Sequence, residues 1–194
     1  MSQRSRHKSI SEPEWGDWRS HRLSDIPVGM QAWLRDTGSL TRKLIQACAP
    51  GCFRVRLLHQ GWALLLNSER RILRSRSGVV MLIREVELLC DEQPWVFART
   101  LIPATSLRGS ARRLTYLGEK PLGALLFADP KATRGMMQIA RLQPRHPLFA
   151  AASVHLRESP AVLWGRRALF QLCGRPLLVN EIFLPGIPSQ GGRV

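Results

Sequence analysis

Residues 79–102 read VVMLIREVELLCDEQPWVFARTLI and contain two mainly apolar runs separated by a short polar segment. The runs at 79–90 and 95–102 are rich in Val, Ile, Leu, Trp and Phe, which favour strands. The segment Asp91-Glu92-Gln93-Pro94 between them is typical of a turn. The two runs are therefore predicted to pair as an antiparallel hairpin.

Four further runs have the same character, and together they predict an antiparallel sheet of six strands. The six expected strands cover residues 53–60, 62–67, 79–90, 95–102, 166–173 and 177–184. A second short connection at 174–176 favours another hairpin, and a third hairpin tip is expected at 59–61.

Helices are expected in a few separate segments. One covers residues 30–34, a second follows a Ser39 N-cap and ends at the turn 49–51, and a third begins after Pro121. The segment around the third helix is expected to be helical or irregular and to cover one face of the sheet. Strands joined by hairpins, with helices gathered on one side, indicate a single α+β domain.

Length and composition are those of one globular domain. The chain has 194 residues, of which 44% are hydrophobic and 22% are charged. We expect an N-terminal arm at 1–29, the domain at 30–188 and a C-terminal tail at 189–194. The N-terminus is polar and no stretch approaches 18 consecutive apolar residues, so a soluble, cytoplasmic protein is expected.

The charge is strongly basic, with 29 Lys and Arg against 14 Asp and Glu and a net charge of +15. An anionic partner is therefore expected, which leaves nucleic acid, an acidic membrane surface or a small multiply charged acid.

The four cysteines at 48, 52, 90 and 173 are too few and too scattered for a disulfide framework, and no histidine spacing completes a metal site with them. We expect structural cysteines and no bound metal.

Three charged residues lie where strand alternation predicts an apolar face. Side chains alternate along a strand, so Arg84 shares a face with Val86 and Leu88. The same count places Arg99 and Glu181 on apolar faces of their strands. A buried charge is unfavourable unless it is paired or faces a cavity. An internal salt bridge is one explanation. The other is a site for a hydroxy acid, because Arg binds carboxylates and Glu can bind a hydroxyl or move a proton.

At these residues the sequence resembles the chorismate pyruvate-lyase (chorismate lyase) family. The matching blocks occur in the same order and span about residues 30–185. They are WL (33–34), SLTR (39–42), REVELL (84–89), PWVFARTLIP (94–103), LGEKPLG (117–123), LWGRR (163–167) and GRPLLVNEIFLP (174–185). Residues 53–78 and 132–155 match poorly.

The resemblance implies a six-stranded antiparallel sheet with helical flaps that cover a buried ligand site. In the family pattern Arg84 corresponds to the residue that binds the ring carboxylate, and Glu181 to the residue at the 4-hydroxyl. Main-chain amides at Leu40 and Leu122 complete the carboxylate site, and we add Arg99 as a further substrate contact. The implied activity is a cofactor-independent carbon–oxygen lyase that converts chorismate to 4-hydroxybenzoate and pyruvate, the first step of ubiquinone biosynthesis.

Two other functions fit part of the sequence. The expected fold resembles the effector module of bacterial transcription regulators, which binds a small acid without changing it. Those regulators carry a separate winged-helix domain before this module, and the 29 residues before Met30 are too few for such a domain. A nucleic-acid-binding protein would account for the charge, but no RNP aromatic pair, GXXG loop or zinc knuckle is present. We therefore expect chorismate and its two products as partners, no nucleic acid, a monomer, and at most transient contact with a membrane surface.

Overall fold

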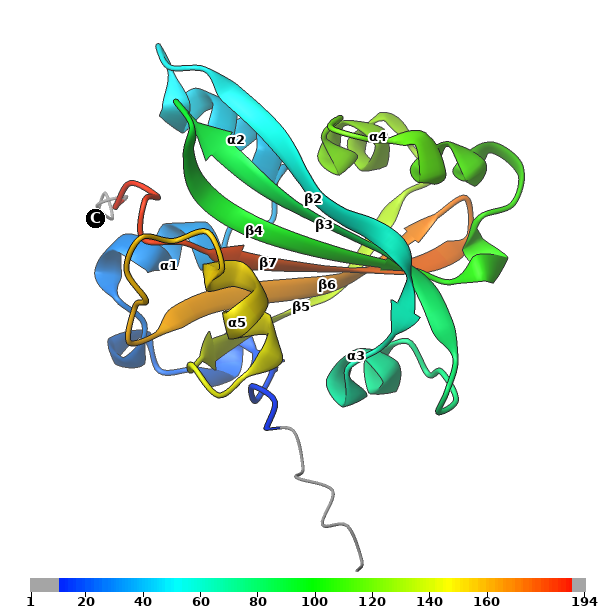
Figure 1. Cartoon of the computed structure of the whole chain (residues 1–194), viewed down its shortest axis with the longest axis horizontal. Coiled ribbons are helices and arrows are strands. Elements are labelled where there is room, and N and C mark those ends of the chain that lie inside the picture. Colours follow the sequence, from blue (N-terminus) through cyan, green and yellow to red (C-terminus); the bar gives the residue numbers. More distant parts are fainter. Residues whose placement is uncertain (1–10, 190–194) are drawn as a thin grey trace, which may run out of the picture.

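A computed structural model of the chain describes residues 11–189, in which one antiparallel sheet has the strand order β1-β5-β6-β7-β4-β3-β2 (Figure 1). The strands are β1 (Gly16–Asp17), β2 (Phe53–Leu64), β3 (Val80–Cys90), β4 (Gln93–Ile102), β5 (Thr133–Leu142), β6 (Leu163–Leu172) and β7 (Arg175–Phe183). The α-helices in this part of the chain are α1 (Val28–Leu34), α2 (Leu40–Cys48), α3 (Asn67–Ile72), α4 (Leu122–Ala128) and α5 (Pro147–Ser153). Short 3-10 helices are η1 (Trp18–Ser20), η2 (Leu23–Asp25), η3 (Ala104–Ser106) and η4 (Gly109–Tyr116).

The α+β class is confirmed, but the sheet has seven strands and the predicted number of six is wrong. Residues 53–64 form one continuous strand, because a bulge between Leu57 and His59 absorbs one irregular position without a reversal of the chain. The hairpin expected at 59–61 is therefore also wrong. The hairpins at 91–94 and 174–176 are confirmed by the β3–β4 and β6–β7 pairings.

The two strands that were not predicted lie on the same edge of the sheet. Strand β5 falls in the segment expected to be helical or irregular, where a register shift between Arg134 and Met137 breaks the alternation of side chains. Strand β1 has two residues and pairs with β5 through Gly16 and Asp17. It belongs to the expected N-terminal arm, of which residues 1–10 lie outside the described part of the chain, as do residues 190–194 of the expected tail.

The predicted helices form, and local sequence explains their ends. The Ser39 side chain accepts a hydrogen bond from the amide of Arg42 and caps α2, whose buried stripe is Leu40, Leu44 and Cys48. Helix α4 follows directly after Pro121, which supplies a favourable φ and needs no amide partner. These two helix starts matter because both face the same cavity, described below.

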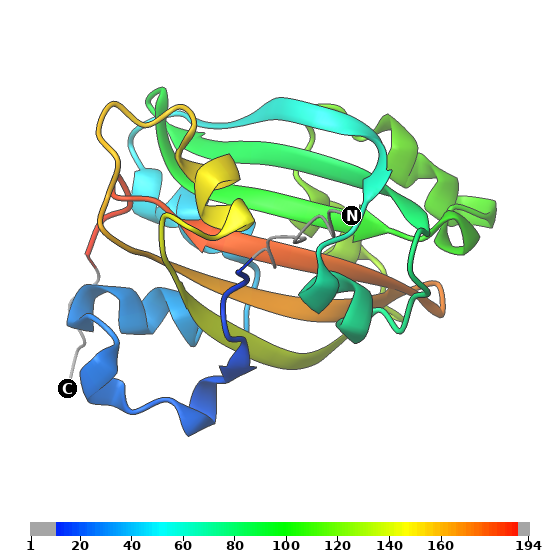
Figure 2. The ribbon, with the colours of Figure 1, turned by 60° about the horizontal axis from the view of Figure 1, so that its bottom comes forward.

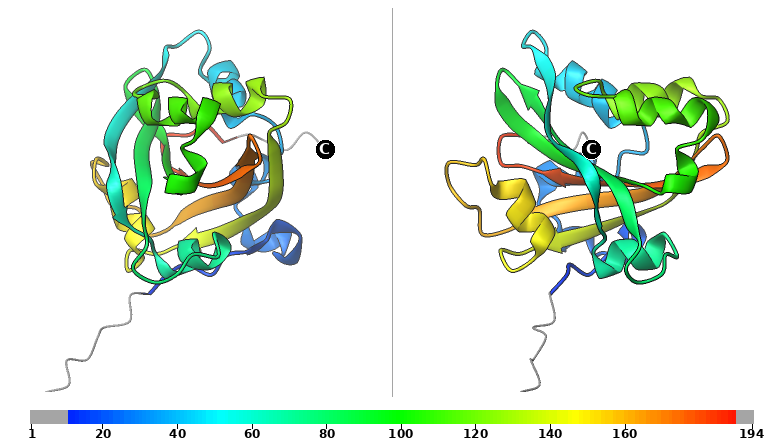
Figure 3. Two further views of the ribbon diagram at one scale, coloured as in Figure 1. Left: turned by 90° about the vertical axis from the view of Figure 1, so that its right-hand side faces the viewer. Right: turned by 45° about the vertical axis from the view of Figure 1, so that its right-hand side comes forward.

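Helices cover both faces of a strongly curled sheet. Helices α2 and α4 lie over the concave face, where the edge strands curve toward one another (Figure 3). Helices α3 and α5 lie across the convex face (Figure 2), and Glu12, near the start of the described chain, accepts hydrogen bonds from the amides of Asn67 and Ser68 in α3. The prediction of helices on one side only is thus wrong, and both sheet faces contribute buried apolar residues. In the residues that the structure describes, no helix is both long and apolar enough to cross a bilayer.

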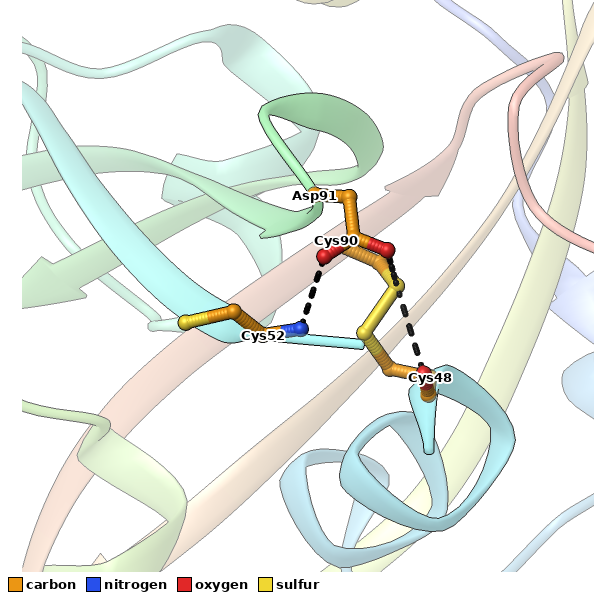
Figure 4. Close-up of a disulfide and its surroundings, with 4 residues drawn as sticks. All are labelled: Cys48, Cys52, Cys90 and Asp91. Carbon is orange, nitrogen blue, oxygen red and sulfur yellow. Dashed lines mark hydrogen bonds between the residues drawn. A yellow bond between two sulfur atoms is a disulfide. The ribbon is translucent and has the colours of Figure 1, made fainter. Parts of the chain in front are cut away.

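A disulfide joins Cys48, the last residue of α2, to Cys90, the last residue of β3 (Figure 4). The two Cα atoms are 5.6 Å apart, and 42 positions separate the residues in the chain. The amide of Cys52 donates to Asp91 Oδ1 at 2.8 Å beside the bridge. The sequence did not predict this bridge, because only the tertiary fold brings this helix end to this strand end. Cys52 and Cys173 are exposed and do not belong to this bridge.

Removal of the disulfide is expected to destabilise the fold. A cross-link across a loop of this size restricts the unfolded chain, and its loss typically costs about 2–4 kcal/mol. Denaturant unfolding of Cys48→Ser/Cys90→Ser should therefore show that much less free energy of unfolding than wild type. The matched control Cys52→Ser/Cys173→Ser should stay within about 0.5 kcal/mol. Equal stability of the two double variants would contradict the expectation.

Candidate active site

A cavity lies between the concave face of the sheet and the N-terminal ends of α2 and α4. The cavity has a volume of about 50 Å³, which is room for several water molecules. The lining residues are Leu40, Thr41, Val55, Arg84, Val86, Leu88, Ala98, Thr100, Pro121, Leu122, Gly123, Leu126, Arg134, Phe170, Val179 and Glu181. Most of this lining is apolar, and its charged members are Arg84, Arg134 and Glu181.

Arg84 is a buried cation that faces the cavity from the middle of β3. It is 2% exposed, and it shares the concave face with Val86 and Leu88 as strand alternation predicts. Its Nη2 donates to the carbonyl oxygens of Gly118 and Lys120, at 2.7 and 3.0 Å. These two carbonyls belong to the turn that leads into α4, so the contact links the strand to the covering helix.

The guanidinium of Arg84 has hydrogen-bonding capacity left over. Its Nε is buried and has no hydrogen-bond partner, and within residues 11–189 no carboxylate forms an ion pair with it. Burial lowers the pKa of Arg84 to about 10, which still leaves it protonated at neutral pH. A buried cation without a counter-ion is unfavourable, so the site is suited to an anionic ligand.

Glu181 approaches the same cavity from β7. In the strand register it pairs with Ala98 of β4 and with Arg166 of β6. Its carboxylate accepts a hydrogen bond from Arg166 Nε at 2.5 Å. Arg166 is 1% exposed and also donates to the carbonyl oxygen of Trp33 at 2.8 Å, which fixes the orientation of the pair.

Arg84 and Glu181 are brought together in one cavity but are not bonded to each other. Arg84 donates to backbone carbonyls and Glu181 accepts from Arg166, so both side chains retain atoms that can contact a ligand in the cavity. The internal salt bridge that the sequence left open is formed by Glu181 with Arg166, but Arg84 forms none with a carboxylate of the described residues. A cation and a carboxylate at separate places of a mainly apolar cavity can bind the two ends of a hydroxy acid.

Leu40 and Leu122 are the first residues of α2 and α4, and both line the cavity. First-turn amides of a helix have no partner within the helix and point toward its N-terminal end. The two helix starts are also in contact with each other. A Cβ placed on Gly123 would come within 2.7 Å of Thr41 Oγ1, so glycine permits this close approach above the cavity.

Arg99 lies on the convex face and is not among the residues that line the cavity. It pairs with Glu85 in the strand register, and its guanidinium forms ion pairs with Glu69 and Glu85. Glu69 is 0% exposed and also accepts from Asn180 Nδ2 at 3.2 Å. Alternation correctly predicted that Arg99 lies on a covered face of the sheet. Because both faces of this sheet are covered, alternation does not predict which face holds the cavity.

The Glu69–Arg99 pair is expected to contribute strongly to stability. Glu69→Gln removes one of the two carboxylates that pair with the Arg99 guanidinium and leaves only Glu85, so it should lower the free energy of unfolding by about 2 kcal/mol. The control is Glu92→Gln, which removes an ion pair with Arg54 at an exposed position and should cost less than about 1 kcal/mol. Denaturant unfolding of both variants tests this difference, and equal effects would refute it.

Sequence reasoning missed Arg134, the third charged residue of the lining. The segment that contains it was expected to be helical or irregular, and it forms β5 instead. Arg134 Nη1 and Nη2 donate to the carbonyl oxygens of Thr37 and Gly38 at 2.8 and 3.0 Å, just before α2. Its guanidinium lies 5.0 Å from the ring centre of Phe170. The alternation of buried Met137 and Ile139 was the available signal for this strand.

The fold and the site define a class of α+β proteins, in which a single curled antiparallel sheet and short covering helices surround one mainly apolar cavity. Solved structures share the fold. The effector domain of PhnF from Mycobacterium smegmatis has a TM-score of 0.51 at 14% identity, with 77% of this chain and 90% of that chain covered. A transcriptional regulator of the GntR family from Bacillus cereus has a TM-score of 0.52 at 10% identity, with 73% and 98% covered.

Sequence comparison gives the family. The chorismate lyase family model matches residues 13–192, and the chain belongs to that family. A protein from Methylococcus capsulatus named "Probable chorismate pyruvate-lyase" is 43% identical over 82% of this chain and 97% of its own length. One with the same name from Nitrosospira multiformis is 39% identical over 92% of this chain and 98% of its own length.

Proposed function

We propose that the protein is a chorismate pyruvate-lyase, a carbon–oxygen lyase that converts chorismate to 4-hydroxybenzoate and pyruvate. The observation that carries the proposal is the buried Arg84, which faces an apolar cavity without a carboxylate partner among the described residues. Chorismate supplies the missing carboxylate on a ring that suits apolar walls. Membership of the chorismate lyase family supports this substrate.

In the proposed complex the ring carboxylate binds at Arg84. The guanidinium offers the unpartnered Nε in addition to Nη2, and an Arg–carboxylate contact is charge-assisted. The backbone amides of Leu40 and Leu122, at the starts of the two covering helices, donate to the same carboxylate. The ring then lies between Val86 and the aliphatic residues of α4, and its 4-hydroxyl reaches Glu181.

The reaction is an elimination that needs no oxidant or reductant. The bond between ring carbon 3 and the ether oxygen breaks, the ring carbon that bears the hydroxyl loses its hydrogen, and the enolpyruvyl fragment gains one hydrogen to become pyruvate. Formation of the aromatic ring supplies much of the driving force. The chain therefore has to orient the substrate and exclude water, and we propose that it does so without a cofactor.

Glu181 is proposed as the residue that acts at the reacting end of the ring. Its carboxylate can accept a hydrogen bond from the 4-hydroxyl and assist the movement of the neighbouring proton. Arg166 holds this carboxylate in place through the contact to Nε. The product, 4-hydroxybenzoate, places the reaction at the start of ubiquinone biosynthesis in our proposal.

Incubation of the purified protein with chorismate tests the proposal. We expect 4-hydroxybenzoate and pyruvate in equal amounts, in buffer with chelator and without added nucleotide. Chorismate that binds but is recovered unchanged would refute the lyase proposal. That result would favour a non-catalytic effector module, comparable to the effector domain of PhnF, which shares this fold.

A further inference from the structure

Chorismate carries a second carboxylate besides the one on its ring. Arg84, Leu40 and Leu122 are proposed to bind the ring carboxylate, so another residue has to bind the second one. That carboxylate belongs to the enolpyruvyl ether on the ring carbon next to the hydroxyl. In a substrate whose ring carboxylate meets Arg84, the ether carboxylate therefore lies at the Glu181 end of the cavity. Two carboxylates close together in an apolar cavity repel each other, so a cation is needed at this end.

We propose that Arg134 binds the enolpyruvyl carboxylate and is the residue that distinguishes the dianionic substrate from the monoanionic product; this inference rests on the proposed function. Arg134 is a charged member of the cavity lining on β5. An Arg guanidinium can bind a carboxylate through parallel hydrogen bonds.

The order of the strands places Arg134 across the cavity from Arg84. Arg84 is on β3 and Glu181 is on β7, two strands further along the sheet order. Arg134 is on β5, another two strands beyond β7. Because the sheet is curled, β5 faces β3 across the concave side (Figure 3). Arg84, Glu181 and Arg134 therefore contact the cavity in that order.

Electrostatics agree with this placement. Burial lowers the pKa of Arg134, and Glu181 is near enough for its negative charge to act in the opposite direction. Arg166 is the other cation near Glu181, but it does not belong to the cavity lining and its charge is already paired with the Glu181 carboxylate. Arg134 is therefore the cation that a second carboxylate at this end would meet.

The contacts of Arg134 to the loop before α2 suggest a positioning role as an alternative, and binding data separate the two roles. If Arg134 only holds the carbonyls of Thr37 and Gly38, its loss should disturb the amide of Leu40. Affinity for every ligand with a ring carboxylate would then fall. If Arg134 binds the second carboxylate, affinity for 4-hydroxybenzoate should stay nearly unchanged.

The test compares Arg134→Met with wild type and with Arg141→Met, which removes an exposed arginine from the same strand. We expect Arg134→Met to raise KM for chorismate by about tenfold or more, as for loss of a charge-assisted contact. Its Kd for 4-hydroxybenzoate should change by less than about threefold, which also shows that the site is folded. Arg141→Met should change neither, and Arg134→Lys should recover part of the loss in KM.

Calorimetry with a non-reacting dicarboxylate separates this inference from the proposed function. The probe is 3-(carboxymethoxy)-4-hydroxybenzoate, which has an ether carboxylate next to the hydroxyl. Wild type should bind it more tightly than Arg134→Met does, while 4-hydroxybenzoate distinguishes the two proteins little. Equal losses for both ligands, or no loss for either, would overturn the role of Arg134. Absence of pyruvate from chorismate with wild type would refute the proposed function alone.

Discussion

Arg84→Met is expected to lower kcat/KM for chorismate by about 10- to 150-fold, mainly through a higher KM. The variant keeps an apolar side chain in the cavity wall but loses a charge-assisted contact of about 1.5–3 kcal/mol to the ring carboxylate. Affinity for 4-hydroxybenzoate should fall by a similar factor, since the product has the same carboxylate. Steady-state kinetics and calorimetry measure the two effects.

The ligand itself provides the control for Arg84. Wild type should bind 4-hydroxybenzoate much more tightly than 4-hydroxybenzamide, which has no negative charge, and Arg84→Met should lose most of this preference. A matched protein control is Arg42→Met, in which an exposed arginine of α2 is replaced. If Arg84→Met keeps the preference of wild type for the acid, Arg84 does not bind the carboxylate.

Glu181→Gln is expected to lower kcat by about 100-fold or more, with a smaller change in KM. Glutamine has the same shape and can still face Arg166, but it is a poor proton acceptor, and a positioned acid or base usually contributes about 10²–10⁴-fold. The measurement is kcat from the rate of pyruvate release. The affinity for 4-hydroxybenzoate should change much less than kcat.

An exposed glutamate near the cavity serves as the control for Glu181. Glu119 lies in the turn before α4, next to the carbonyls that accept hydrogen bonds from Arg84, and its side chain is not among the residues that line the cavity. Glu119→Gln should have the kcat of wild type. A wild-type kcat in Glu181→Gln would show that Glu181 does not take part in the reaction.

Alternation along single strands predicted two charged residues that line the cavity. The patterns around Arg84 and Glu181 are regular over several residues on each side, and in the structure both residues line the cavity. The pattern describes one strand at a time, so it cannot say which face of a two-sided sheet holds a ligand. Arg99 shows this limit, because its face is occupied by Glu69 and Glu85.

The remaining differences come from contacts that are distant in the sequence. The irregular register of β5 prevented the prediction of this strand and of Arg134 as a site residue. The bulge in β2 suggested a turn at a position where the strand continues. The Cys48–Cys90 disulfide depends on the packing of α2 against the end of β3. Each of these features is fixed by the tertiary fold, and local propensity gives only weak signals for them.

The central claim is that Arg84 and Glu181 bind opposite ends of one hydroxylated aromatic acid, and a crystal structure of the protein with 4-hydroxybenzoate tests it most directly. We predict the ring inside the cavity, with its carboxylate within hydrogen-bonding distance of the Arg84 guanidinium and its hydroxyl within that distance of the Glu181 carboxylate. A ring bound in the reverse orientation, or outside this cavity, would contradict the claim.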